Sequence, residues 1–179
     1  MMVCTGNICR SPMAEGLLRL RLAERGCTQI EVLSAGTWAY DGNPASDGSA
    51  EVFRSRGWDL GEHRSRSLTH EVLKEADLVV AMTSVHRREI LELDPSAEPK
   101  TVLIKELAEI EARLDVGDAA GRLAALLASE RPAWRRALDL DDPMGLPLFA
   151  YERSFAEIEA GIEVLTEVLC PRPTRGRIA

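Results

Sequence analysis

Residues Cys4–Ser11 read Cys-Thr-Gly-Asn-Ile-Cys-Arg-Ser, and this stretch decides the fold expected of the chain. Val3, just before it, ends a predicted strand, and the apolar, helix-compatible run 13–18 follows it closely. A loop between a buried strand and a helix lies at the carboxyl end of a parallel sheet, where α/β proteins bind ligands. Its successive backbone N–H groups and the amino end of the helix favour an anion. The stretch therefore predicts an anion-binding loop.

Cys4, Arg10 and Ser11 supply the chemistry expected of this loop. A free cysteine is mostly protonated at neutral pH, but a helix amino end and neighbouring cations favour its thiolate. The Arg10 guanidinium offers a planar fork to two phosphoryl oxygens, which lysine could not reproduce. The Ser11 hydroxyl can donate to the sulfur and help it leave. Attack of a thiolate on phosphorus forms a phosphocysteine, so the loop predicts a cysteine-dependent phosphatase.

Three further residues complete the predicted site. Gly6 allows a close backbone approach or a positive φ, and Asn7 tolerates the left-handed conformation and can tie the loop with its amide. The leaving group of the reaction needs a general acid, and Asp142 is the candidate because Pro143 holds it extended on a loop. The same carboxylate could then activate the hydrolytic water. An Asp-Pro pair is also an ordinary turn starter, so from the residues alone both interpretations stay open.

Length and composition are those of a single globular domain, which we expect to cover residues 1–170. The chain has 179 residues, of which 45% are hydrophobic and 28% charged, as in ordinary globular proteins. Its net charge of −7 argues against binding to nucleic acid or to an anionic membrane surface, because both need a basic protein surface. No stretch approaches the roughly 20 apolar residues of a membrane span, and no secretory leader opens the chain. A cytoplasmic location is therefore expected.

The cysteines and histidines do not have the spacing of a metal site. The four cysteines are Cys4, Cys9, Cys27 and Cys170. In a cytoplasmic enzyme of this size, free thiols are expected rather than structural disulfides. Neither the separation of Cys4 from Cys9 nor the positions of the three histidines match zinc ligands. No metal or other cofactor is predicted, and from the residues alone Cys9 is either a core residue or a redox partner.

Apolar and helical patterns alternate along the chain in the manner of βαβ units. Strands are predicted up to Val3 and over 30–35, 76–82 and 101–104; helices are predicted over 12–25, 45–56, 68–75, 85–93 and 147–169. Ser11 is the expected N-cap of the first helix, with Pro12 at its first position. The pattern predicts an α/β fold: a three-layer sandwich with a four-stranded parallel sheet, helices on both faces, and the phosphate loop between the first strand and first helix.

Three segments are expected to lie outside this plan. The alanine- and leucine-rich segment 106–138 is predicted to form two additional helices, with a turn at 115–118 and a break at Pro132. Residues 63–66, His-Arg-Ser-Arg, predict a solvated or sheet-edge patch, and residues 171–179 a flexible tail.

With the cysteine loop near its start and Asp142-Pro143 more than 130 residues later, the chain resembles the low-molecular-weight protein tyrosine phosphatases. In the larger tyrosine phosphatases the acid loop precedes the cysteine. The resemblance covers nearly the whole chain, through residues 4–12, 34–37, 63–66, 76–82 and 142–143. It implies that Cys4 is the nucleophile, Arg10 the phosphate-binding arginine and Asp142 the general acid.

The resemblance also implies a substrate site and a redox device. The expected substrate-binding residues are Thr5, Gly6, Asn7, Ile8, Cys9, Ser11 and Tyr40. Tyr40 would wall the substrate slot, although Trp38 is near enough to compete. Cys9 corresponds to a second loop cysteine that can form a reversible disulfide with the nucleophile. The implied partners are a phosphorylated protein and the kinase that acts on it; the oligomeric state is not predicted.

The chain departs from the family pattern in four ways. Only three residues precede Cys4, so either the protein begins upstream or its central strand is short. Met144 stands where an aromatic residue usually follows Asp-Pro, and Thr83 stands where tyrosine-specific members often carry Asp. The 106–138 segment is longer than usual.

The substrate prediction depends on Ile8. Residues 68–84 look similar to a protein-arginine phosphatase branch of the family, which carries threonine at the position of Ile8. Tyrosine phosphatases carry an aliphatic residue there. An aliphatic side chain has no acceptor to orient a guanidinium, and the pocket residue outweighs the remote stretch. Phosphotyrosine is therefore the expected substrate, with phosphoarginine as the alternative.

Two other functions of this fold are disfavoured. Thiol-linked arsenate reduction needs further cysteines near residues 82–92, and that stretch contains none. A non-catalytic phosphoprotein-binding relative would usually lack the nucleophile, the arginine or the acid, and all three are present here.

Overall fold

The computed structural model describes residues 1–109, 118–128 and 138–172. Its centre is a sheet of four parallel strands in the order β2-β1-β3-β4, namely β1 Met2–Cys4, β2 Ser34–Gly36, β3 Val79–Ala81 and β4 Thr101–Leu103. All twelve strand residues are buried, as a parallel sheet covered on both faces requires. β1 pairs on both sides, with Val3 opposite Ala35 and Ala81. The predicted parallel sheet is confirmed.

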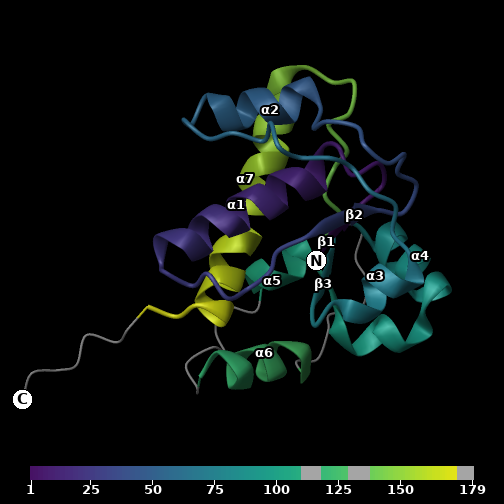
Figure 1. Ribbon diagram of the computed structural model, residues 1–179, viewed down its shortest axis with the longest axis vertical. Helices are drawn as coiled ribbons and strands as arrows, with labels where there is room; N and C mark the ends of the chain where they lie inside the picture. The colour runs from purple at the N-terminus through teal and green to yellow at the C-terminus, as the bar shows by residue number, and fades with distance from the viewer. Residues whose placement is uncertain (110–117, 129–137, 173–179) are drawn as a thin grey trace, which may run out of the picture.

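Helices cover both faces of the sheet, so the predicted layered α/β fold is confirmed (Figure 1). Side chains alternate between the faces of a strand, and the core accordingly divides into two clusters. Met2, Val80 and Val102 join the cluster beneath α1 Arg10–Glu24 and α7 Leu148–Leu169. On the other face Val3, Val79, Ala81 and Leu103 pack with residues of α3 His70–Glu75 and α4 Ser84–Leu93.

The remaining elements extend these two layers. Helix α2 Asp47–Arg54 packs on α7 and α1, and α5 Ile104–Glu109 also packs on α7. The 3₁₀ helix η1 Pro95–Lys100 leads into β4, and α6 Ala119–Ala128 packs against α7. Thus α5 begins two residues before the predicted elaboration, and α6 lies inside it. Residues 110–117 and 129–137, with the predicted break at Pro132, and tail residues 173–179 lie outside the described residues.

Helix α1 begins earlier than predicted. Its first residue is Arg10, its N-cap is Cys9, and no side chain caps it. The prediction that Ser11 is the N-cap is therefore wrong. The Ser11 hydroxyl bonds to Cys4 and Asn7 instead, because the preceding loop folds back over the amino end of the helix.

The expectation that all four cysteines are free is also wrong. Cys27 and Cys170 form a disulfide with a Cα–Cα distance of 6.2 Å. They are 143 residues apart in sequence, but Cys27 follows α1 and Cys170 follows α7, and these two helices pack together. The disulfide therefore joins the carboxyl ends of two neighbouring helices. Cys4 and Cys9 are free and buried.

Candidate active site

The loop between β1 and α1 brings the Cys4 thiol to the amino end of a helix. Cys4 is the last residue of β1, and its Sγ lies 2.9 Å from the Oγ of Ser11 in the first turn of α1. The Asn7 side-chain amide donates to the same Oγ at 2.9 Å. Since that oxygen accepts from Asn7, the Ser11 hydroxyl proton is free to point at the sulfur. A thiolate on Cys4 would thus receive a hydrogen bond and face the positive end of the helix dipole.

Asn7 holds the loop together by hydrogen bonds of its side chain. It is fully buried, and its φ of 53° lies in the left-handed region, as predicted. Its Nδ2 also donates to the Ser34 Oγ of β2 at 2.7 Å, and its Oδ1 accepts the Arg66 N–H at 2.9 Å. The His63 Nε2 lies 2.7 Å from its main-chain oxygen. A buried amide with every hydrogen-bonding group satisfied holds the loop in one conformation.

These contacts correct the prediction of a solvated patch at residues 63–66. Ser65 is 2% exposed and His63 is largely buried against the loop. The Arg66 Nε donates to the Ser34 oxygen at 2.7 Å. The sheet-edge part of the prediction agrees with the structure, because the Gly36 N–H of β2 donates to the Arg66 oxygen at 2.9 Å beside a parallel bridge between Gly36 and Ser67. Arg64 is exposed, as predicted, but His63 and Arg66 use their polar groups to hold the loop and β2.

Two glycines act differently at the loop. A Cβ on Gly36 would lie 2.4 Å from the Thr5 oxygen and 2.9 Å from the Asn7 nitrogen, so only glycine lets the loop pack on β2. Gly6 is not among the residues with positive φ, which contradicts one of the two predicted reasons for it. A Cβ there would meet Ile8 at an ordinary 3.6 Å. The other predicted reason, a close approach of the backbone to a ligand, stays a prediction.

Arg10 connects the loop with Asp142 from the far end of the chain. Its side chain is 5% exposed, and its NH2 donates to the Asp142 Oδ2 at 2.7 Å. Its NH1 donates to the Leu140 oxygen at 3.1 Å. The Nε is buried and has no hydrogen-bond partner among the described residues. One guanidinium thus bonds to the predicted acid and keeps one buried donor unused.

The segment carrying Asp142 is anchored at the carboxyl end of β3. The Leu140 N–H donates to the Met82 oxygen at 3.0 Å, and the Asp139 carboxylate accepts from the Ser84 N–H at 2.6 Å. Asp142 itself accepts the Met144 N–H at 3.1 Å, and its side chain is half-exposed. The carboxylate therefore faces solvent from a fixed loop.

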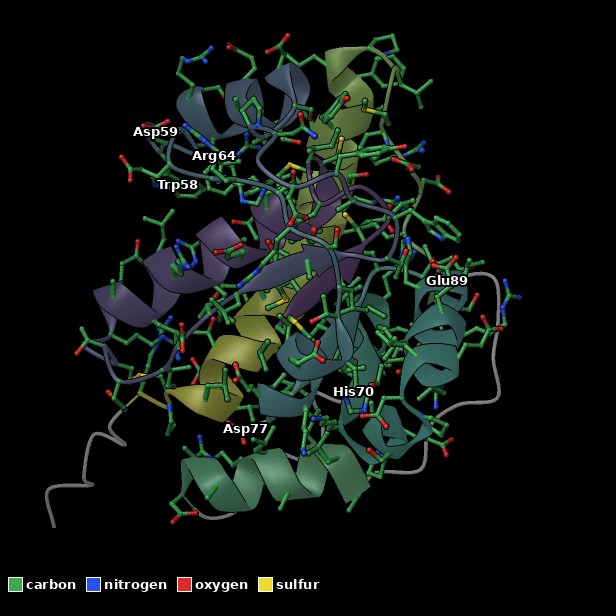
Figure 2. All side chains as sticks on the ribbon, turned by 45° about the vertical axis from the view of Figure 1, so that its right-hand side comes forward. Trp58, Asp59, Arg64, His70, Asp77 and Glu89 are labelled. Carbon is green, nitrogen blue, oxygen red and sulfur yellow. A yellow bond between two sulfur atoms is a disulfide. The ribbon has the colours of Figure 1, made fainter. Side chains whose placement is uncertain are left out.

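The surroundings of the loop expose several large apolar side chains. Trp38 is 73% exposed, Tyr40 84% and Met144 56%. The Trp38 indole donates to the Glu89 carboxylate at 2.9 Å, and Figure 2 shows where Glu89 lies on α4. Ile8 is half-buried and packs against the core beneath α1. The rings of Trp38 and Tyr40 are thus both available on the segment after β2.

Cys9, the last loop residue before α1, is held away from solvent. Its thiol donates to the Ser46 Oγ at 3.2 Å and contacts the Met144 sulfur at 3.5 Å. Burial raises the pKa of Cys9. The thiol form of Cys9 is therefore the resting form at neutral pH.

A family model described as low molecular weight phosphotyrosine protein phosphatase matches residues 1–122. The chain belongs to this family. It is 34% identical over 163 residues to a probable low-molecular-weight protein-tyrosine-phosphatase, EpsP, of Ralstonia solanacearum, covering 91% of this chain and 90% of that protein. It is also 34% identical over 167 residues to a protein-arginine-phosphatase of Geobacillus stearothermophilus, covering 93% of each.

The fold agrees with solved members of the family. The crystal structure of the low-molecular-weight protein tyrosine phosphatase from T. tengcongensis superposes with a TM-score of 0.72 at 35% identity, covering 93% of this chain and 95% of that one. The Geobacillus arginine phosphatase superposes with a TM-score of 0.70 at 32% identity, covering 93% and 88%. The chain is thus a phosphatase of the low-molecular-weight type, and its relatives include enzymes named for either substrate.

The sequence did not reveal that His86 belongs to this phosphatase site. His86 is 3% exposed. Its Nε2 lies 2.8 Å from the Thr5 Oγ1 and its Nδ1 3.0 Å from the Thr83 Oγ1. Burial, and then the nearby charge of Arg10, lowers the pKa of His86 to about 4. The only local signal was the Thr83 N-cap three residues earlier, which does not point to Thr5.

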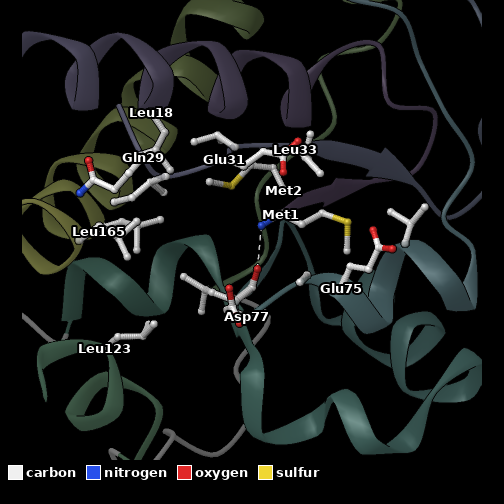
Figure 3. Close-up of a pocket in the computed structure, with 16 residues that line it drawn as sticks. Met1, Met2, Leu18, Gln29, Glu31, Leu33, Glu75, Asp77, Leu123 and Leu165 are labelled. Carbon is white, nitrogen blue, oxygen red and sulfur yellow. Dashed lines mark hydrogen bonds between the residues drawn. The ribbon is translucent and has the colours of Figure 1, made fainter. Parts of the chain in front are cut away.

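A large cavity lies at the other end of the sheet. Its volume is about 430 Å³, and its lining includes Met1, Leu78, Leu123 of α6 and Leu165 of α7 (Figure 3). The Met1 amine donates to the Leu78 oxygen at 2.7 Å, and burial lowers the pKa of this amine to about 6. No residue of the loop Thr5–Ser11 lines this cavity. The cavity is therefore separate from the phosphatase site.

The described residues contain neither a metal-binding cluster nor a helix that could span a membrane. In residues 1–109, 118–128 and 138–172, no three or more His, Cys, Asp or Glu side chains gather in a way that could hold a metal ion. Of the helices described, none has the length and apolar content needed to cross a membrane.

Proposed function

We propose that the chain hydrolyses phosphotyrosine on proteins through a phosphocysteine, with Cys4 as nucleophile, Arg10 as phosphate-binding residue and Asp142 as general acid. The observation that carries this proposal is the geometry of Arg10. Its guanidinium bonds to Asp142 at 2.7 Å, and its Nε is a buried donor without a partner among the described residues. A buried unpaired donor costs about 1–3 kcal/mol. A phosphoryl oxygen would satisfy it.

The first chemical step follows from these positions. The phosphoryl group binds to the loop amides of Thr5–Arg10 and to the Arg10 fork, and Asp142 then turns from Arg10 toward the leaving group. The Cys4 thiolate attacks phosphorus, the phosphorus–oxygen ester bond breaks, and protonated Asp142 gives its proton to the phenolate oxygen. The products are a phosphocysteine and a phenol.

The second step returns the enzyme to its starting state. Asp142, now a carboxylate, takes a proton from a water molecule that attacks the phosphocysteine. The sulfur–phosphorus bond breaks, and inorganic phosphate leaves. The Ser11 hydroxyl, 2.9 Å from the sulfur, donates to the departing thiolate and stabilises it.

The surroundings of the loop support an aromatic substrate. The exposed rings of Trp38 and Tyr40 can contact a phenyl ring, since aromatic pairs in contact add about 0.5–1.5 kcal/mol beyond area burial. Ile8 contributes an aliphatic surface and no hydrogen-bond acceptor. These features favour a flat apolar leaving group over a guanidinium.

Phosphoarginine is the second candidate. The 34% identity to the Geobacillus protein-arginine-phosphatase extends over 93% of each chain, a longer match than the one to the Ralstonia protein. Arsenate reduction is less well supported, because Cys27 and Cys170 are bonded to each other beyond the carboxyl end of α1. That helix has 15 residues, which place them about 22 Å from its amino end.

The test compares phosphotyrosine and phosphoarginine peptides with the wild-type chain and with Ile8→Thr. We expect the wild type to have the higher kcat/KM for phosphotyrosine and Ile8→Thr to shift the preference toward arginine. Cys4→Ser is the control for background hydrolysis. Wild-type turnover no greater than that of Cys4→Ser would refute phosphatase catalysis, and a preference of the wild type for phosphoarginine would refute the substrate.

A further inference from the structure

A chain of hydrogen bonds from α4 reaches the mouth of the proposed site. Thr5 follows the nucleophile directly and is exposed. Its Oγ1 lies 2.8 Å from the Nε2 of buried His86 and 3.5 Å from the NH2 of Arg10. Asp142 accepts from the same NH2 at 2.7 Å. The Thr5 hydroxyl is therefore beside the proposed acid and the proposed phosphate-binding group, and His86 takes no part in the mechanism given above.

The donors and acceptors in this series of hydrogen bonds determine where each proton lies. The Thr83 Oγ1 already accepts the His86 backbone N–H at 3.2 Å, so its own proton is available for the His86 Nδ1. Nε2 then carries the ring proton and donates to Thr5. The opposite tautomer would leave the Thr83 hydroxyl proton without a partner. The first arrangement leaves its free proton on Thr5, which is exposed, whereas Thr83 is only partly exposed. Water or a ligand reaches the exposed hydroxyl more readily, which favours the first arrangement, and the low pKa of His86 keeps the ring neutral at pH 7.

This arrangement determines whether the Thr5 hydroxyl can donate or accept a further hydrogen bond. A threonine hydroxyl has one proton and two lone pairs. His86 and Arg10 both donate to the Thr5 oxygen, and together they occupy both lone pairs. The hydroxyl proton is the remaining group, and it belongs to an exposed side chain. Thr5 can therefore donate to a ligand but cannot accept from one.

We propose that Thr5 donates a hydrogen bond to the ester oxygen of the substrate, and that His86 and Thr83 are positioning residues that make Thr5 a donor and so favour O-phosphoryl over N-phosphoryl substrates. The inference rests on the proposed function, because it assigns Thr5 to the same site. The leaving oxygen of an aryl phosphate has lone pairs that accept from Thr5. The guanidinium of phosphoarginine presents N–H donors, which would face another donor.

The experiment measures the ratio of kcat/KM for phosphotyrosine to that for phosphoarginine. In His86→Leu the Thr5 lone pair is released, and we expect the ratio to fall about tenfold, the effect of one hydrogen bond to a charged group. Thr5→Val should lower the ratio by weakening the phosphotyrosine reaction, and Thr5→Ser should keep the wild-type ratio. Adding His86→Leu to Thr5→Val should change the ratio no further, because His86 acts through Thr5.

Thr83→Val tests the same inference in a second way, since it removes the hydroxyl that donates to the His86 Nδ1 and leaves the buried His86 ring in place. We expect it to lower the ratio in the same direction. His70→Leu, a histidine on α3 that is half-exposed, is the matched control and should leave the ratio unchanged. An unchanged ratio in folded His86→Leu and Thr83→Val, or an equal effect of His86→Leu with and without Thr5→Val, would overturn the inference.

A failure of the proposed function gives a different result. If the wild type hydrolyses neither substrate, binding is measured instead. The ratio is then the affinity for phenyl phosphate divided by the affinity for free phosphoarginine, each taken from a dissociation constant. Each variant then also carries Cys4→Ser, so that turnover plays no part. A ratio that still falls with His86→Leu supports the inference even then, and one that does not fall refutes it.

Discussion

The two ends of α1 each have a pair of cysteines, in opposite chemical states. At the amino end, Cys4 and Cys9 are free thiols in a loop held by hydrogen bonds. Beyond the carboxyl end, Cys27 is bonded to Cys170 after α7. The 15 residues of α1 separate the two ends by about 22 Å. In the proposed mechanism only the loop end takes part in the reaction, so the difference teaches that the covalent cross-link and the proposed nucleophile lie at opposite ends of one helix.

The largest expected effect tests the loop end alone. We predict that Asp142→Asn lowers kcat about 100- to 10,000-fold, because the leaving group then departs without a proton donor. Asp141→Asn is the matched control: Asp141 is the neighbouring exposed carboxylate, bonded to Arg153 at 2.8 Å, and its kcat should stay near wild type. The measurement is steady-state hydrolysis of an aryl phosphate. Equal losses in the two variants would refute the assignment of the acid.

The next effect tests the other end. We predict that replacing Cys27 and Cys170 with serine lowers the free energy of unfolding by about 2–5 kcal/mol, the usual effect of a disulfide that closes a long loop. Because the loop end of α1 is held by its own contacts, kcat should not change. Urea denaturation and kinetics on the same preparation measure both quantities. A large loss of kcat with unchanged stability would contradict the separation of the two ends.

The sequence predicted what is local and missed what is distant. The strand, loop and helix around Cys4 could be predicted because each depends on neighbouring residues, and Pro143 identified Asp142 for the same reason. The contact of His63 with Asn7, that of His86 with Thr5 and the Cys27–Cys170 disulfide join segments 56 to 143 residues apart. No local pattern specifies such contacts, because they exist only after the sheet brings its loops together. Of the two reasons offered for Gly6, a positive φ is excluded, because Asn7 is the loop residue that adopts it.

A smaller effect concerns His86 and pH. Its pKa in the fold is about 4, below the ordinary value near 6.5, so between these values the unfolded chain binds more protons than the folded one. Stability must therefore fall as pH decreases from about 6.5 toward 4, by on the order of 2 kcal/mol from this residue. Urea denaturation at pH 7 and at about pH 4.5 should show a smaller pH effect in His86→Leu than in the wild type. His70→Leu should behave as the wild type does, and an identical pH effect in all three chains would contradict the prediction.

The smallest expected effect returns to the free cysteine pair. Peroxide would oxidise the Cys4 thiolate to a sulfenic acid with release of hydroxide, and the Cys9 thiol would then displace water to form a disulfide. Burial raises the pKa of Cys9, which keeps it a thiol until Cys4 has been oxidised. We predict that, after peroxide, a thiol reductant restores several-fold more activity to the wild type than to Cys9→Ser, in which Cys4 proceeds to irreversible oxidation. The Cys27→Ser, Cys170→Ser double variant should recover as the wild type does, because the disulfide that it lacks lies at the other end of α1. Equal recovery in the wild type and Cys9→Ser, with no Cys4–Cys9 link by mass spectrometry, would show that the free pair protects nothing.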